Sequence, residues 1–244
     1  MNDPALSTRL LNIANSALFR PPGSEPLADL RQVVMRIGFK EIRNIAMASA
    51  VVRLVGNIPH RLFNRTEFLR HCIATSLIAI HLGQKLRHQY PALKSDELHL
   101  GGLLHDLGKI FLDAEFPEQL EECISLSMHH RLPLVEAERL VMELTHDELG
   151  EYLCRQWELP PVARHSIRYH HNPAGAPAEH RITIMLINMA NYLANVSDLG
   201  NSGDFTRPVF DQTVWKQTGT APNDFLACVE EARKQVDEIM QLFV

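Results

Sequence analysis

Hydrophobic positions recur every three or four residues along most of the chain, which is the period of an α-helix that packs on one face. Two N-terminal examples run over residues 6–14 and, across a break at Gly38, over residues 33–46. No stretch alternates apolar and polar residues for long enough to form a strand. The pattern therefore predicts an all-α protein. Further helices are expected at 64–86, 96–113, 117–129, 133–143, 146–156, 160–170, 178–196 and 223–242.

Residues 198–222 interrupt the helical pattern, because Gly, Pro, Asn and Thr gather there, and this composition is typical of a loop. One helical turn is expected inside it, around Val214. The sequence thus predicts a helical domain over residues 2–197, a loop over 198–222 and a C-terminal amphipathic helix over 223–243. Packing of this helix on the body is favoured over its docking on a partner.

Composition narrows the class of protein. The 244 residues carry 24 Lys+Arg against 29 Asp+Glu, a formal net charge of −5, which argues against a basic nucleic-acid clamp. No apolar run is long enough to span a membrane, and the N-terminus has no secretory signal pattern. The four cysteines lie far apart without a Cys-x-x-Cys pair, so reduced thiols in a cytoplasmic protein are expected. The unusual number is 13 histidines, since histidine is the commonest metal ligand.

One segment carries candidate chemistry: residues 101–109, Gly-Gly-Leu-Leu-His-Asp-Leu-Gly-Lys. Adjacent residues of a helix diverge by about 100°, so His105 and Asp106 cannot close a site alone. They can supply two metal ligands where other helices bring partners, and mixed imidazole and carboxylate ligands suit Fe, Mn, Zn or Ni rather than Ca or Mg. Candidate partners at sensible spacings are His71, His146, His170 and His171.

A lone buried histidine with a backbone partner is commoner than a histidine that binds metal. The metal-site hypothesis therefore depends on whether these side chains converge in the fold, which their spacing in the sequence cannot prove. The remaining histidines are interpreted as surface or packing residues. They include His60, His81, His88, His99, His129, His130, His165 and His180.

Four segments in one order carry a family resemblance: residues 3–11 with Asn15-Ser16-Ala17, Ile37-Gly38 with residues 42–47, residues 102–109, and residues 146–173 with Trp157-Glu158-Leu159-Pro160 between the histidines. Through them the chain resembles the HDOD domain, the HD-related output domain of bacterial signal transduction. This domain is a branch of the HD metal-dependent phosphohydrolase superfamily. The resemblance implies an HD-type multi-helix bundle, here with a C-terminal helical extension.

The resemblance also implies a ligand set for one or two divalent transition metals. It assigns an early histidine, the His-Asp pair, an additional histidine and a histidine doublet to His71, His105, Asp106, His146, His170 and His171. The closing aspartate of active HD relatives falls on Asn191, which is neutral and a poor anionic ligand. Asp198, about two helical turns on, is too far along to replace it.

Two further departures from the family pattern matter. Residues 172–177 lack the Gly-Tyr-Pro triplet of the HD-GYP phosphodiesterases, which argues against cyclic-dinucleotide hydrolysis of that type. The family domain also normally has more helical residues ahead of the motif that begins at Asp3, so the domain is expected to be N-terminally short. Apolar positions such as Leu10 and Ile13 would then be exposed, and a homo-oligomer would cover them.

The favoured hypothesis is a non-catalytic regulatory HDOD module that acts through protein partners of a signalling pathway and retains a metal site. The alternative is a metal-dependent phosphohydrolase acting on a nucleotide or small phosphoester, with Lys109 either contacting phosphate or lying on a solvated helix face. In a third hypothesis the metal only rigidifies the helices, so that its occupancy signals to a partner. Nucleic-acid binding is the weakest, because Lys and Arg are scattered.

Overall fold

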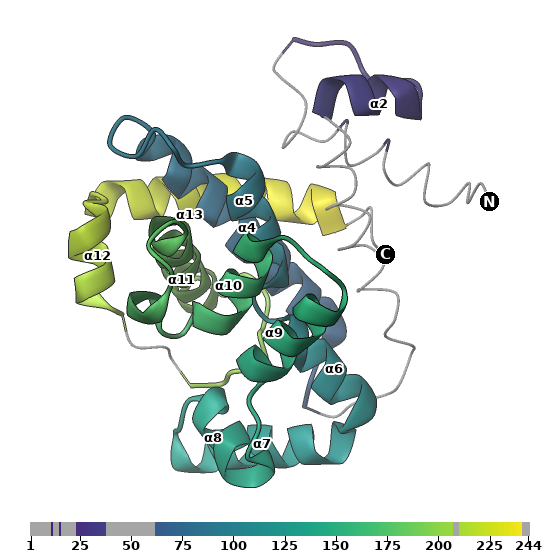
Figure 1. The fold of residues 1–244 in the computed structure, drawn as a ribbon, viewed down its shortest axis with the longest axis vertical. Coiled ribbons are helices and arrows are strands. Elements are labelled where there is room, and N and C mark those ends of the chain that lie inside the picture. The colour runs from purple at the N-terminus through teal and green to yellow at the C-terminus, as the bar shows by residue number, and fades with distance from the viewer. Residues whose placement is uncertain (1–10, 12–14, 16–22, 38–61, 207–209, 241–244) are drawn as a thin grey trace.

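The computed structural model describes residues 11, 15, 23–37, 62–206 and 210–240, and these ranges contain helices and turns but no strand (Figure 1). The all-α prediction is therefore confirmed. The predicted helix over 6–14 and the break at Gly38 lie essentially outside the described residues. The helices are α2 (Leu30–Ile37), α4 (Arg65–Lys85), α5 (Ser95–Leu104), α6 (Leu107–Glu115), α7 (Pro117–His130), α8 (Leu134–Met142), α9 (His146–Gln156), α10 (Pro161–Tyr169), η1 (Pro173–Gly175), α11 (Arg181–Val196), α12 (Gln212–Thr218) and α13 (Pro222–Met240).

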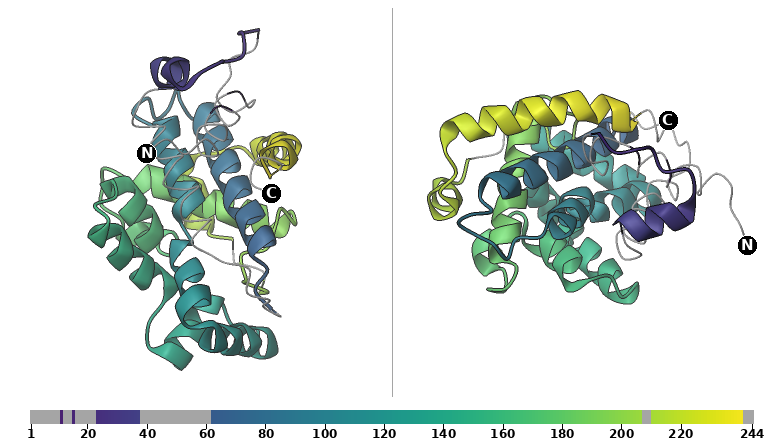
Figure 2. Two further views of the ribbon diagram at one scale, coloured as in Figure 1. Left: turned by 90° about the vertical axis from the view of Figure 1, so that its right-hand side faces the viewer. Right: turned by 90° about the horizontal axis from the view of Figure 1, so that it is seen from above.

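Helix α4 is the central element of the bundle. Most of its 21 residues are buried, which is expected of a helix that is apolar on all sides. It begins where the Asn64 side chain accepts hydrogen bonds from the backbone N–H groups of Thr66 and Glu67, at 3.0 and 3.1 Å. Helices α5, α11 and α13 pack against it, and Figure 2 shows α13 lying along one side of the bundle.

The predicted helix over 96–113 is in fact two helices, and the break falls on the two residues between them, His105 and Asp106. The physical reason is a close approach between backbones. A Cβ atom on Gly108 would lie 1.9 Å from the carbonyl oxygen of His146, so the first turn of α6 is packed directly on the start of α9. The break points the side chains of His105 and Asp106 toward the same interior region, which a continuous helix could not do.

Two smaller apolar clusters hold the remaining helices around this break. One joins the N-terminal part of α4 to α6, α7 and α8, with Cys123, Ile124 and Leu134 at its centre. The other joins α5 and α6 to α9 and α10 through residues such as Leu104 and Ile167. The helices that meet at the break are thus each fixed by their own hydrophobic contacts.

The C-terminal part returns to α4. Within the segment expected to be a loop, Asp211 caps the start of α12, where its carboxylate accepts from two backbone N–H groups. Gly219, with a positive φ of 70°, caps its end. Helix α13 buries Cys228 and Val229 in the largest apolar cluster, which α4 also lines. Among the described residues, no helix is both long and apolar enough to cross a membrane.

Candidate metal centre

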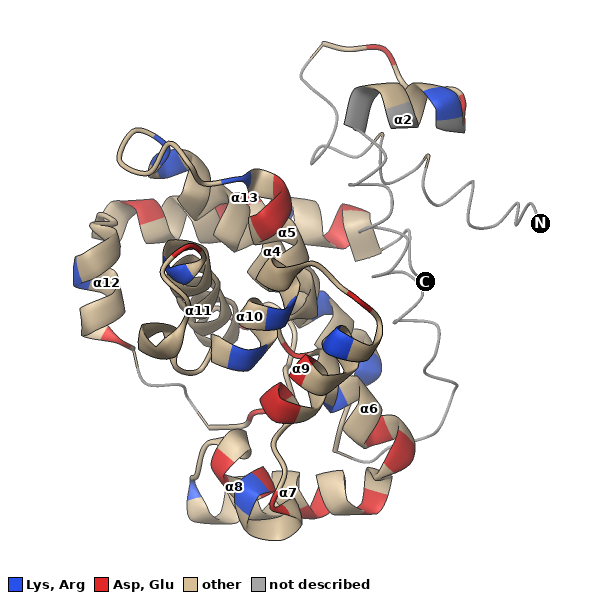
Figure 3. Ribbon diagram, in the orientation of Figure 1, with Lys and Arg blue, Asp and Glu red and all other residues tan. Residues whose placement is uncertain are grey.

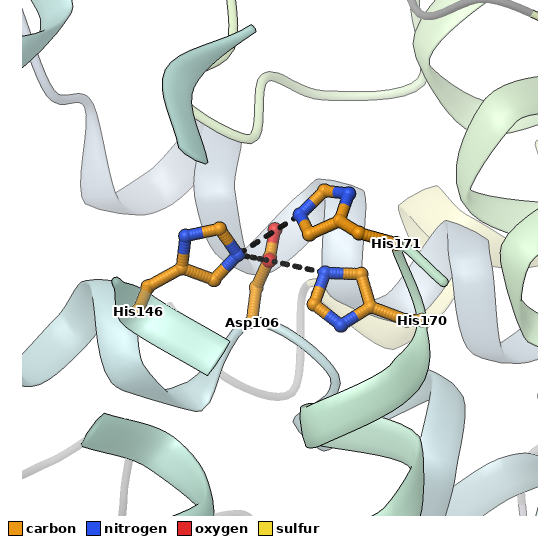
Figure 4. Close-up of side chains that lie close together, drawn as sticks. All are labelled: Asp106, His146, His170 and His171. Atoms are coloured by element: carbon orange, nitrogen blue, oxygen red, sulfur yellow. Dashed lines mark hydrogen bonds and ion pairs between the residues drawn. The ribbon is translucent and has the colours of Figure 1, made fainter. Parts of the chain in front are cut away.

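The break between α5 and α6 is surrounded by histidines from three other helices. His71 lies on α4, His146 is the first residue of α9, and His170 and His171 follow the last turn of α10. Figure 4 shows the rings of His146, His170 and His171 directed toward the carboxylate of Asp106. The convergence that linear spacing could not prove is therefore present in the fold.

Asp106 is the hub of the cluster. Its Oδ1 lies 3.2 Å from Nε2 of His146 and 3.3 Å from Nε2 of His170. Its Oδ2 lies 3.3 Å from Nε2 of His105 and 2.8 Å from the ammonium of Lys109. The side chains of Asp106 and of the three histidines are all fully buried.

The other ring nitrogen of each histidine is held by an acceptor. Nδ1 of His105 lies 2.8 Å from the carbonyl oxygen of Gly102, and Nδ1 of His170 lies 2.8 Å from that of Ile167. Nδ1 of His146 lies 2.7 Å from a carboxylate oxygen of Glu138. Because these acceptors place a hydrogen on Nδ1, each ring turns its Nε2 toward Asp106, which is the orientation of metal-ligating histidines.

The candidate ligands form two groups that share one residue. Asp106, His146, His170 and His171 make the first group, and His71, His105 and Asp106 make the second. Within each group the ligand atoms lie within 4.8 Å of one another. Nitrogen lone pairs and carboxylate oxygens this close repel each other unless a cation lies among them, so the residues fit one or two divalent transition metals, with Asp106 able to bridge.

The surroundings shift the pKa values of the cluster residues in different directions. Burial and the neighbouring His105 lower the pKa of His71 to about 3, so this ring stays neutral, as a ligand must. Burial opposes the charge of Asp106, but Lys109 and His105 outweigh it and hold the pKa of the carboxyl well below its usual range. Burial also opposes the charge of His146, but Glu138 and Asp106 raise its pKa to about 9. His146 therefore carries a proton when no metal is bound.

Asn191, on α11, lies beside the second group. Its side chain lies close enough to His71 to act on the pKa of that ring, and its Oδ1 accepts from Nδ2 of Asn195 at 2.8 Å. The structure thus brings the residue aligned with the closing aspartate next to the candidate ligands. Its amide supplies no negative charge there.

Lys109 is not on a solvated helix face: only 2% of its side chain is exposed. It reaches a cavity of about 260 Å³ that begins at the first ligand group. His171, the one exposed member of that group, lines this cavity together with Asn191 and Arg131. The cavity joins the candidate metal centre to the surface.

Sequence reasoning missed two features of the region. The first is the contact of Glu138 with His146, which no sequence pattern indicates. Glu138 stands eight residues before His146, and the two meet only because the chain turns between α8 and α9. The second is a separate cluster of His165, Glu179 and His180, which the sequence interpretation left among surface and packing histidines.

The sequence matches the HDOD domain family over residues 1–173. The chain belongs to the HDOD family. Solved structures share this fold. An HDOD domain protein with unknown function from Geobacter sulfurreducens superposes with a TM-score of 0.75 at 22% identity and covers 99% of this chain and 82% of its own.

Two further HDOD-like folds are similar. A protein from Marinobacter aquaeolei VT8, provisionally named a signal transduction protein, has a TM-score of 0.73 at 20% identity, over 99% of this chain and 52% of its own. A protein from Shewanella amazonensis SB2B, provisionally named a phosphohydrolase, has a TM-score of 0.71 at 22% identity, over 99% and 84%. At these identities the likeness shows the fold alone.

A sequence relative comes from Treponema pallidum (strain Nichols) and is named only as an uncharacterized protein. It is 28% identical over 189 residues, which are 78% of this chain and 35% of the relative. This HDOD chain therefore spans about a third of the length of that relative.

Proposed function

We propose that this HDOD domain is a regulatory, non-catalytic module that works through protein partners of a signalling pathway and reversibly binds a divalent transition metal. The observation that carries the proposal is the ion pair between Lys109 and Asp106, at 2.8 Å inside the ligand cluster. The two ligand groups contain a single carboxylate, and this cation already neutralises it. Asn191 adds no charge, so the centre has less negative charge than tight binding of two catalytic ions requires.

Metal occupancy would act on the packing of the bundle. His71, His105, His146, His170 and His171 would hold the ion with Asp106, and they come from α4, from the α5–α6 break, from α9 and from the end of α10. An ion bound there would remove the repulsion among the lone pairs and could polarise an oxygen ligand. A weakly charged site fills and empties with metal supply, and this suits a domain whose helix packing is read by a partner.

The distribution of charge supports a protein partner. In the described ranges, Lys and Arg occur on α2, α4, α6 and on every α-helix from α8 to α13, and Figure 3 shows them spread over the molecule rather than gathered along one edge. A polyanion needs a continuous positive surface, so we infer a partner other than nucleic acid. The match to part of a longer relative is consistent with an HDOD unit used as a module within larger proteins.

The test is metal content and turnover in the same sample. Protein purified without chelator is analysed by mass spectrometry for Fe, Mn, Zn and Ni, and is then assayed with nucleotides and small phosphoesters in added Mn or Fe. We expect detectable bound metal that rises toward saturation with added Mn or Fe, a lower melting temperature after chelation of the loaded protein, and no turnover. Robust metal-dependent turnover would overturn the non-catalytic role. Absence of bound metal together with an unchanged melting temperature would overturn the metal site.

A second candidate function, metal-dependent hydrolysis of a small phosphoester, is favoured by one observation. The cavity of about 260 Å³ beside His171 is lined by the cationic side chains of Lys109 and Arg131. Its size suits a nucleotide fragment rather than a polymer. In this case Arg131→Ala should raise KM for the phosphoester, and inorganic phosphate should compete with it. No measurable turnover by fully metal-loaded wild-type protein would end this candidate.

A further inference from the structure

A second cluster of ligating side chains lies away from the Asp106 centre. Nδ1 of His165, on α10, is 3.0 Å from Nδ1 of His180, the residue just before α11. A carboxylate oxygen of Glu179 is 3.9 Å from the same His180 atom. One ligand atom from each residue lies within 4.8 Å of the other two. The two histidines are half-buried and Glu179 is exposed, so solvent reaches the cluster from one side.

The hydrogen bonds of the cluster define which ring nitrogen of His165 carries the hydrogen. A guanidinium nitrogen of Arg164 lies 3.2 Å from Nε2 of His165. Arginine can only donate, so Nε2 accepts and the hydrogen of the neutral ring is on Nδ1. That hydrogen then points at the Nδ1 lone pair of His180. Binding of an ion through both Nδ1 atoms requires His165 to move its hydrogen to Nε2, and Arg164 opposes this change.

We propose that His165, His180 and Glu179 form a second metal site, for Zn²⁺ or a similar borderline transition ion. Two imidazoles and one carboxylate are a ligand set that zinc accepts, and the exposed side leaves room for water to complete a four-coordinate shell. Atom pairs 3.0 and 3.9 Å apart can contact one common ion. The proposal uses none of the residues of the Asp106 centre and does not depend on the proposed function.

An ion bound at this site would act on the segment between His165 and His180. His165 and His180 stand at the two ends of the segment that contains His170, His171 and η1. Helices α10 and α11 lie next to each other (Figure 1), and an ion between these two histidines would link the middle of α10 to the start of α11. Binding would therefore stabilise the segment that carries two candidate ligands of the Asp106 centre.

The experiment is a Zn²⁺ titration of the tag-free full chain by calorimetry, with Co²⁺ absorption as a second readout of coordination. In a His105→Gln/His146→Gln/His171→Gln background, which removes ligands from both groups of the Asp106 centre, we expect Zn²⁺ binding to persist. Adding His165→Gln/His180→Gln should weaken the remaining binding about tenfold or more, and Glu179→Gln should weaken it less. Arg164→Ala should strengthen it, an effect that a merely structural role of the cluster would not produce.

The exposed pair His129 and His130 on α7 provides the matched control. Replacement of both by Gln removes two histidines without touching the cluster and should leave the titration unchanged. If the remaining binding is lost in this control, or is unaffected by His165→Gln/His180→Gln, the proposal is wrong. If the background variant does not fold, the same two double substitutions are compared in the wild-type chain. The proposal then requires a loss of one bound ion for His165→Gln/His180→Gln alone.

Discussion

The ammonium of Lys109 lies 2.8 Å from Oδ2 of Asp106, and both side chains are buried. They stand one turn apart at the start of α6, where a divalent cation would otherwise meet the carboxylate. Burial alone would lower the pKa of Lys109, but Asp106 and Asp204 raise it above its ordinary value. The lysine is therefore charged, and it competes with any metal for Asp106.

This competition predicts opposite effects of Lys109→Met on stability and on metal binding. Without metal, the variant leaves the Asp106 charge buried with less compensation, and the free energy of unfolding should fall by about 3 kcal/mol. Affinity for Mn²⁺ or Zn²⁺ should rise, because the carboxylate is released to the ion. Denaturant unfolding and calorimetric titration measure the two effects.

The control for this prediction is Lys94→Met, which breaks the exposed pair with Glu97. It should change stability little, because solvent screens an exposed pair, and it should leave metal affinity unchanged. Weaker metal binding by Lys109→Met would show that the lysine supports the metal rather than opposing it.

Asn191→Asp should strengthen metal binding. The substitution adds a carboxylate beside His71, and we expect affinity to rise by about tenfold to a hundredfold. Asn195→Asp is the matched control, since it adds the same charge one turn further along α11. Equal gains in both variants would indicate a general effect of charge and would remove Asn191 from the ligand position.

The pH dependence of the metal-free chain follows from His146. Its pKa is raised to about 9 in the folded state from an unfolded value of 6.5, so its protonation stabilises the fold fully below pH 6.5. This stability is lost as pH rises through about 9, and it amounts to about 3 kcal/mol at most. Denaturant unfolding between pH 6 and about 9.5 should show the loss in metal-free wild-type protein.

Glu138→Gln should flatten this dependence, because glutamine still accepts the hydrogen bond from Nδ1 but no longer favours the charged ring. Glu136→Gln, an exposed neighbour on α8, should keep the wild-type profile. Since metal binds only the neutral ring, wild-type metal affinity should rise with pH over the same range. An identical profile in Glu138→Gln would mean that His146 is not the titrating group.

The helices could be predicted from the apolar pattern of the sequence, whereas the histidine cluster could be predicted only through a family resemblance. The difference has a physical reason. The burial of α4 is visible as apolar residues on all sides and that of α11 as apolar periodicity, since those residues contact the core directly. The break at His105 left no trace in that periodicity, because it depends on contact between the backbones of Gly108 and His146. Contacts between residues distant in sequence, such as Glu138 with His146 or His165 with His180, have no local signature at all.

The break itself can be tested through Gly108. A Cβ atom there would lie 1.9 Å from the carbonyl oxygen of His146, and backbone cannot yield as a flexible side chain can. Gly108→Ala should therefore push α9 away from α6 and cost about 3 kcal/mol of stability. Because His146 moves with α9, metal affinity should fall as well. Gly175→Ala, where the nearest atom is the Asn172 side chain at 3.3 Å, is the control and should change both quantities little. Loss of stability with unchanged metal affinity would mean that the contact fixes the fold but does not position His146.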